Sequence, residues 1–140
     1  MHDDGSLLAA LINCASLCLL DASIPLRGIL ASMSCCLCSN DNGTDDILLV
    51  DPTRSEEQTW LTCCTVAVLS SDPKKADLMR ASGGDPMYFD KVPLLQIVGT
   101  ADIKKISALR DRSVAACDIV QHSFAASLNA KLSKCHIFCQ

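Results

Sequence analysis

A glycine and a hydroxyl residue stand at the start of an apolar run in HDDGSLLAALINC, residues 2–14. Such a pair at the N-terminus of a helix can bind an anion such as phosphate, because the free amides and the helix dipole both attract negative charge. Leu7 follows Gly5 and Ser6, at the point where a phosphate site would need a positive side chain. Ser6 acting only as a helix cap explains the same residues. The segment by itself is therefore a weak signal for phosphate binding.

Three acidic residues lie close together near the middle of the chain. Asp51, Glu56 and Glu57 could hold a divalent metal ion or relay a proton. The simpler interpretation, which we favour, is a solvated loop between two strands. No serine or cysteine lies in a nucleophile setting such as G-x-S-x-G. The histidines are scattered along the chain: His2, His122 and His136.

The chain contains ten cysteines, and most of them lie within apolar runs. Secreted disulfide scaffolds are small and rich in loops, which does not fit this pattern. We therefore predict that the cysteines are small buried hydrophobic residues in a reducing compartment. The alternative is a zinc site with these ligands: Cys117, Cys135, His136 and Cys139. Structural zinc usually has two compact ligand pairs and only one compact cluster exists here, so we predict no metal and no cofactor.

Length and composition predict one domain that exposes apolar surface. The chain has 140 residues, of which 49% are hydrophobic and only 4% aromatic. Such a composition indicates either very dense packing or an apolar surface that contacts another chain, and we favour the second. The formal net charge is −4 and no basic stripe occurs, so electrostatics do not predict tight binding to nucleic acid.

The hydrophobic pattern predicts a helix, several strands and a second, long helix. The first helix covers 6–22, is capped by Ser6 and is apolar nearly all round, so we expect it to be central and buried. Strands are predicted at these ranges: 29–37, 47–51, 61–70, 75–84 and 91–100. The first two form a hairpin around an Asn-Gly turn in 40–46. This order predicts an α+β fold.

The long helix is the clearest element in the sequence. We place its cap at Thr100, after which apolar residues recur with gaps that are mostly three and four: Ile103, Ile106, Val114, Cys117, Val120, Phe124, Leu128 and Leu132. Most of its charged residues are expected on the solvent-exposed face of the helix: Lys104, Lys105, Arg110, Asp111 and Arg112. The other apolar run, 7–20, is too short for a membrane span and no positive residue precedes it, so we predict a soluble intracellular protein without a membrane contact.

Three segments together resemble the second half of the RNase PH family. They are HDDGSLLAALINCASLCLLDASIPLRG, SCCL and LLVDPTRSEE. More narrowly, they resemble the catalytically silent RNase-PH-like subunits of the eukaryotic RNA exosome ring, of which two sister subunits remain open. The resemblance implies an RNase PH-like fold of the ribosomal protein S5 domain 2 type. It implies an antiparallel sheet packed with a buried N-terminal helix and a long C-terminal helix. Residues 1–140 would then be one incomplete domain that lacks the N-terminal part.

The resemblance also implies that the catalytic site is lost. Active members have Gly-Thr-Arg at the start of this helix, and the arginine binds the phosphate that attacks RNA. The matching residues here are Gly5, Ser6 and Leu7. Leucine cannot form charge-assisted hydrogen bonds to phosphate. Asp51 matches the first acid of the family's acidic cluster, and Glu56 and Glu57 remain nearby. The stretch that should hold the decisive aspartate, QTWLT at 58–62, contains none.

The implied function is that of a non-catalytic exosome subunit in 3′-to-5′ RNA processing and decay, including rRNA maturation and mRNA turnover. Its partners would be the other RNase PH-like ring subunits, the cap subunits and RNA bound through the assembled complex. The expected location is the nucleus and nucleolus, and also the cytoplasm. No base-stacking set of aromatic residues is present, so the RNA-binding residues stay unknown. The alternative function is a phosphate-dependent 3′-to-5′ exoribonuclease that uses the acids near Asp51.

Overall fold

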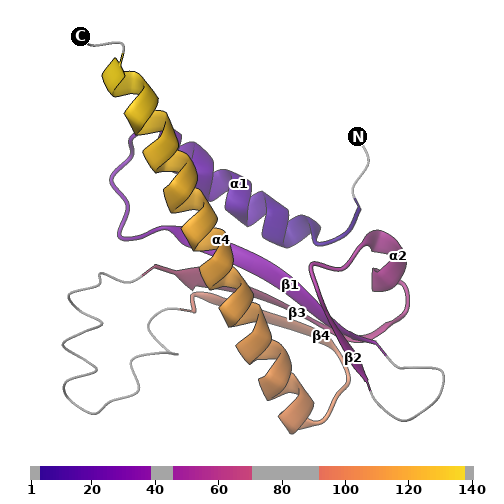
Figure 1. The fold of residues 1–140 in the computed structure, drawn as a ribbon. Coiled ribbons are helices and arrows are strands. Elements are labelled where there is room, and N and C mark those ends of the chain that lie inside the picture. The colour runs from indigo at the N-terminus through magenta and orange to yellow at the C-terminus, as the bar shows by residue number, and fades with distance from the viewer. Residues whose placement is uncertain (1–3, 39–45, 71–91, 138–140) are drawn as a thin grey trace, which may run out of the picture.

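The computed structural model describes residues 4–38, 46–70 and 92–137. Its elements are α1 (Leu7–Asp21), β1 (Leu30–Cys38), β2 (Ile47–Val50), α2 (Arg54–Glu57), β3 (Trp60–Leu69), β4 (Leu94–Gly99) and α4 (Ile103–Ile137). The strands form one antiparallel sheet in the order β2-β1-β3-β4 (Figure 1). The α+β class and the pairing of the first two strands are thus confirmed. The predicted Asn-Gly turn and the predicted strand at 75–84 lie outside the described residues.

The helix α4 crosses one face of the sheet and forms the core with it (Figure 1). The core combines side chains of β1 and β3 that point to this face with side chains from the first half of α4: Ala31, Cys35, Leu37, Cys64, Val66, Val68, Leu109, Val114 and Cys117. The Cys117 thiol donates to the Val66 carbonyl oxygen over 3.6 Å, and the Gln121 amide donates to the Val68 carbonyl oxygen over 2.9 Å. These contacts fix α4 across the two central strands.

Two details of α4 differ from the sequence prediction. The helix begins at Ile103 rather than directly after Thr100, and the Ile106 amide donates to the Asp102 carbonyl oxygen, so Thr100 is not the cap. Ile103 is 83% exposed, although its spacing had placed it on the buried face. That face instead includes Leu109 and Ser113, because the buried stripe begins one and a half turns into the helix, where the sheet first covers it.

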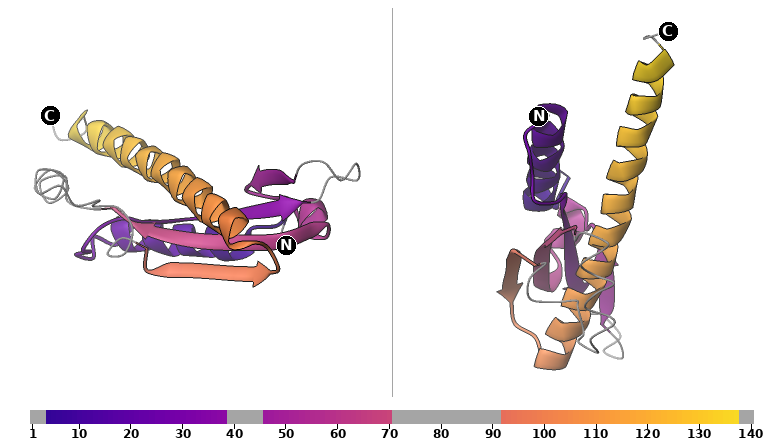
Figure 2. Two further views of the ribbon diagram at one scale, coloured as in Figure 1. Left: turned by 90° about the horizontal axis from the view of Figure 1, so that it is seen from below. Right: turned by 90° about the vertical axis from the view of Figure 1, so that its left-hand side faces the viewer.

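The helix α1 runs beside β1 and is separated from α4 over most of its length (Figure 2, right). Our prediction that α1 is central and buried is wrong within this chain. Of its fifteen residues only Ala9 and Ser16 are buried, whereas Leu7 is 51% and Leu11 57% exposed. Apolar character shows that a helix avoids water, but it does not show which chain covers it.

The described cysteines divide into three groups, one of which, Cys38 and Cys63, is half-buried. Cys35, Cys36, Cys64 and Cys117 are buried, which confirms the predicted burial of these four. Burial raises the pKa of the Cys64 thiol to about 11 and that of the Cys117 thiol to about 12, so both stay protonated at neutral pH. Cys14 and Cys18 on α1 are exposed, and for them the prediction is wrong. Within the described ranges, no helix is both long enough and apolar enough to cross a membrane.

Candidate functional site

The structure brings the opening turn and the acidic segment together. Three hydrogen bonds join them across about fifty residues of sequence. The Ser6 amide donates to Glu57 Oε1 over 2.7 Å, and the Ser6 hydroxyl donates to the Pro52 carbonyl oxygen over 3.2 Å. The Arg54 amide donates to the Asp4 carbonyl oxygen over 2.9 Å. The two segments that the sequence singled out separately are therefore one structural unit, which we call the joined turn (residues 4–7 and 51–57).

Ser6 stands at the N-cap position of α1 but does not cap the helix with its side chain. Its backbone is left-handed, at φ 49° and ψ 28°, and its hydroxyl is turned away to the Pro52 carbonyl. A capping hydroxyl needs an extended backbone to reach the amides of the first helical turn. The prediction that Ser6 occupies the N-cap position is confirmed. The prediction that its side chain caps the helix is wrong.

The Ser6 amide is one of the backbone donors that a phosphate at this helix start could use. In this chain it is bound by the Glu57 carboxylate, which is itself an anion. The chain therefore satisfies its own amide with its own negative charge, where an anion site needs free donors. Leu7, which comes next, is exposed and carries no donor. Both features oppose phosphate binding at this turn.

Gly5 is the residue that makes the close approach possible. Its φ is 96°, a conformation that side-chain-bearing residues rarely adopt. A Cβ atom at this position would lie against the Pro52 carbonyl oxygen and 2.8 Å from the Arg54 backbone nitrogen. The glycine is thus required by the joined turn itself, whether or not the turn binds a ligand.

Glu56 has a structural partner inside its own turn. Its carboxylate accepts hydrogen bonds from the Thr53 amide and the Thr53 hydroxyl, both over 2.8 Å, and the Glu56 amide donates back to that hydroxyl. This reciprocal capping box lowers the pKa of the Glu56 carboxyl, because the hydrogen bonds favour the charged form. A lowered pKa means that the box stabilises the folded chain above the ordinary pKa of glutamate and loses this effect as the pH falls.

The three acids do not form a metal site. Asp51 is exposed, with a left-handed φ of 56°, and its amide is held by the Ser34 carbonyl oxygen over 2.9 Å. Across the residues that the structure describes, no three His, Cys, Asp or Glu side chains gather as metal ligands. Glu56 and Glu57 are each engaged by backbone amides. Of the predicted zinc ligands, Cys117 is buried in the core, and the side chains of Cys135, His136 and Cys139 lie outside the described part.

Asn13 has a structural role that the sequence analysis missed. Its side-chain amide donates to the Ser32 carbonyl oxygen over 2.9 Å, and its side-chain oxygen accepts from the Ser32 amide over 2.7 Å. β2 pairs with β1 only from Cys35 onward, so at Ser32 the edge of β1 on that side has no strand partner. The Asn13 side chain supplies the two hydrogen bonds that a neighbouring strand would otherwise make to Ser32. The available signal was a single amide side chain within an otherwise apolar helix.

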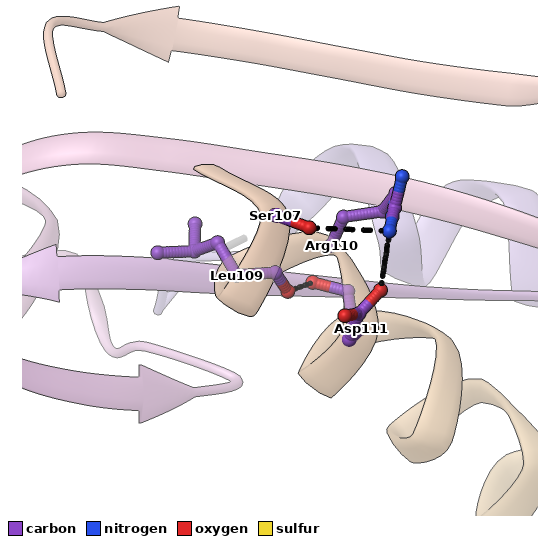
Figure 3. Close-up of polar contacts among 5 residues, drawn as sticks. Ser107, Leu109, Arg110 and Asp111 are labelled. Carbon is purple, nitrogen blue, oxygen red and sulfur yellow. Dashed lines mark hydrogen bonds and ion pairs between the residues drawn. The ribbon is translucent and has the colours of Figure 1, made fainter. Parts of the chain in front are cut away.

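Three cations on α4 form ion pairs with carboxylates: Lys105, Arg110 and Lys131. The Arg110 guanidinium donates to Asp111 Oδ1 over 2.8 and 3.0 Å and to the Ser107 hydroxyl over 3.3 Å (Figure 3). Two further ion pairs join α4 to other segments, namely Lys105 with Asp46 and Lys131 with Asp21. Lys104, Lys105, Asp111 and Arg112 are exposed, and Arg110 is half-buried, so the predicted solvent-exposed face is largely confirmed.

Comparison with known proteins supports the fold and the family resemblance. No family model matches the chain. The crystal structure of rice Rrp46 superposes with a TM-score of 0.68 and covers 92% of this chain and 51% of the rice chain, at 19% identity. A protein named as an RRP46 homologue of the exosome in Arabidopsis thaliana is 41% identical over 58 residues, which are 41% of this chain and 22% of that protein.

The fold is RNase PH-like, and the chain resembles Rrp46. A putative exosome component RRP41 of Caenorhabditis elegans is also similar, at 29% identity over 135 residues, which are 96% of this chain and 47% of that protein. Ribosomal RNA processing protein 46, one of the two sister subunits that the sequence left open, is named in the Arabidopsis relative and in the rice structure; the other sister subunit is mRNA transport regulator 3. The chain spans about half the length of the RRP41 relative and of rice Rrp46, and less of the Arabidopsis protein.

Proposed function

We propose that the chain is a non-catalytic RNase PH-like ring subunit of the RNA exosome that supports 3′-to-5′ RNA processing and decay, including rRNA maturation and mRNA turnover. The observation that carries this proposal is the bond from the Ser6 amide to the Glu57 carboxylate. A phosphorolytic subunit needs that turn free for phosphate, and here an internal anion holds it. The exposed Leu7 and the absence of an acid in 58–62 point the same way.

The exposed surface of α1 supports the assembly role. Six apolar side chains on α1 and the loop after it are each between about two fifths and three fifths exposed: Leu7, Leu8, Leu11, Leu19, Ile24 and Leu26. Several exposed apolar side chains on one helix and the loop after it are typical of a contact with another folded chain. Other RNase PH-like ring subunits and the cap subunits are the proposed partners, and RNA would be bound through the assembled complex. The proposed locations are the nucleus, the nucleolus and the cytoplasm.

Affinity capture of the tagged full chain from nuclear and cytoplasmic extracts tests the assembly. We expect several ring subunits to be recovered with the wild-type chain. Burying one leucine contributes about 1.5–3 kcal/mol, so Leu11→Glu should reduce this recovery at least roughly tenfold. Ala125→Glu, which places the same charge on an exposed position of α4, is the matched control and should leave recovery unchanged.

Recovery of no other ring subunit with the wild-type chain would contradict the proposal. Equal loss of recovery with Leu11→Glu and Ala125→Glu would instead show that α1 has no special part in assembly.

A further inference from the structure

Two cysteine pairs stand side by side across the two central strands. In the pairing of β1 with β3, Cys36 lies directly opposite Cys63 and Cys35 directly opposite Cys64. Because successive side chains of a strand point to opposite faces, the two pairs lie on different faces of the sheet. Cys35 and Cys64 face α4. Burial raises the pKa of both thiols, and the buried Ser113 hydroxyl partly offsets this effect. Cys36 and Cys63 lie on the other face.

The backbone geometry brings Cys36 and Cys63 close together. The Ser34 carbonyl oxygen accepts from Asp51, and the backbone groups of Ser32 bind Asn13, so both residues direct these groups away from β3. Cys36 lies two residues after Ser34, so its backbone groups also point away from β3. It therefore forms a non-hydrogen-bonded pair with Cys63. Such pairs have Cα atoms about 4.5 Å apart, which falls within the roughly 4.4–6.8 Å range of disulfide-bonded cysteines.

The two thiols of this pair influence each other's pKa. Interaction between the two side chains lowers the pKa of the Cys63 thiol and raises that of the Cys36 thiol. Cys63 is also partly exposed, whereas Cys35 and Cys64 are fully enclosed. Burial disfavours both thiolates, and the negative charge of Glu57 adds to this effect. One partly exposed thiol with a second cysteine directly opposite it is the arrangement of a cysteine and its resolving partner.

We propose that Cys36 and Cys63 form a peroxide-sensitive dithiol that closes to an intramolecular disulfide between β1 and β3. The Cys63 thiolate attacks hydrogen peroxide, so that an S–O bond forms, the O–O bond breaks and hydroxide leaves as water after taking a proton. The Cys36 sulfur then attacks the Cys63 sulfenic acid, forming the S–S bond, and the S–O bond breaks to release a second water. Two thiols are oxidised by two electrons in total, and one peroxide is reduced to two waters.

Peptide mass spectrometry of the full chain tests this proposal. The chain is treated with hydrogen peroxide, its remaining thiols are alkylated under denaturing conditions, and it is digested with trypsin without reduction. Residues 28–54 and 55–74 form two tryptic peptides that carry the two pairs. We expect these peptides to be joined after peroxide and separate without it. Fragment ions should place the bond between Cys36 and Cys63, and a non-reducing gel should show that the joined peptides come from monomeric chain.

Matched variants within the same two peptides provide the control. Cys36→Ser and Cys63→Ser should each abolish the joined peptides, whereas Cys35→Ser and Cys64→Ser should keep them. In Cys36→Ser, the Cys63 sulfenic acid has no partner and should be trapped by dimedone. A bond assigned to Cys35, Cys38 or Cys64, or oxidation of Cys63 to sulfinic acid in the wild-type chain without joined peptides, would overturn the proposal. The fragment-ion assignment needs no substitution, so it decides the question even where a variant fails to fold.

Discussion

Replacing Asn13 by alanine is expected to lower the free energy of unfolding by about 2–4 kcal/mol. The variant leaves the Ser32 amide and the Ser32 carbonyl without partners, and Ser32 is fully buried. Each buried backbone group that loses its hydrogen bond costs about 1–3 kcal/mol, because water cannot replace the partner. Urea denaturation followed by circular dichroism measures the change as a lower midpoint at an unchanged slope.

Two further substitutions make this test specific. Asn13→Asp keeps the acceptor for the Ser32 amide and loses the donor to the Ser32 carbonyl, so its effect should fall between wild type and Asn13→Ala. Asn129→Ala changes the same residue type at an exposed site on α4 and should alter the free energy of unfolding by less than about 0.5 kcal/mol. Equal small effects of Asn13→Ala and Asn129→Ala would show that Asn13 does not complete the edge of β1.

Gly5→Ala is expected to destabilise the chain by about 3 kcal/mol or more. The new Cβ would meet the Pro52 carbonyl and lie 2.8 Å from the Arg54 nitrogen, and the backbone would be held at φ 96°. Relief of this clash requires the joined turn to separate, with loss of the bond from Ser6 to Glu57. The same urea measurement reports the effect, and a variant that is insoluble or unfolded in the absence of urea agrees with it.

Ser6→Ala is the comparison for Gly5→Ala, since it changes the neighbouring residue without adding bulk. It removes only the 3.2 Å hydrogen bond from the Ser6 hydroxyl to Pro52, which is worth about 1 kcal/mol. If Gly5→Ala were no more harmful than Ser6→Ala, the close packing of Gly5 against residues 52–54 would be incorrect.

Local patterns predicted most of the described elements. The first helix, the hairpin strands, the third strand and the long helix all lie within a few residues of their predicted bounds. These signals depend on neighbours in sequence, such as spacing of apolar residues and a proline after a helix. Burial was harder to predict, since α1 has an apolar composition but exposes Leu7 and Leu11. Composition cannot say whether the covering partner belongs to the same chain.

The joined turn could be predicted only in part. Gly5, Ser6 and Asp51 to Glu57 were singled out by residue type and by family resemblance. Their contact across about fifty residues depends on the sheet, which returns the end of β2 to the start of α1. The left-handed backbone of Ser6 and the double hydrogen bond of Asn13 likewise follow from tertiary packing. No spacing rule contains that information.

The central claim is that this chain assembles into an RNA-degrading complex without catalysing phosphorolysis itself. The most direct test incubates the purified full chain with single-stranded RNA and inorganic phosphate and measures nucleoside diphosphates by chromatography, with a phosphorolytic RNase PH as the positive control. We predict no release above that of a reaction without protein. Release of nucleoside diphosphates that disappears when Asp51, Glu56 and Glu57 are replaced by alanine would contradict the claim and establish the phosphate-dependent exoribonuclease.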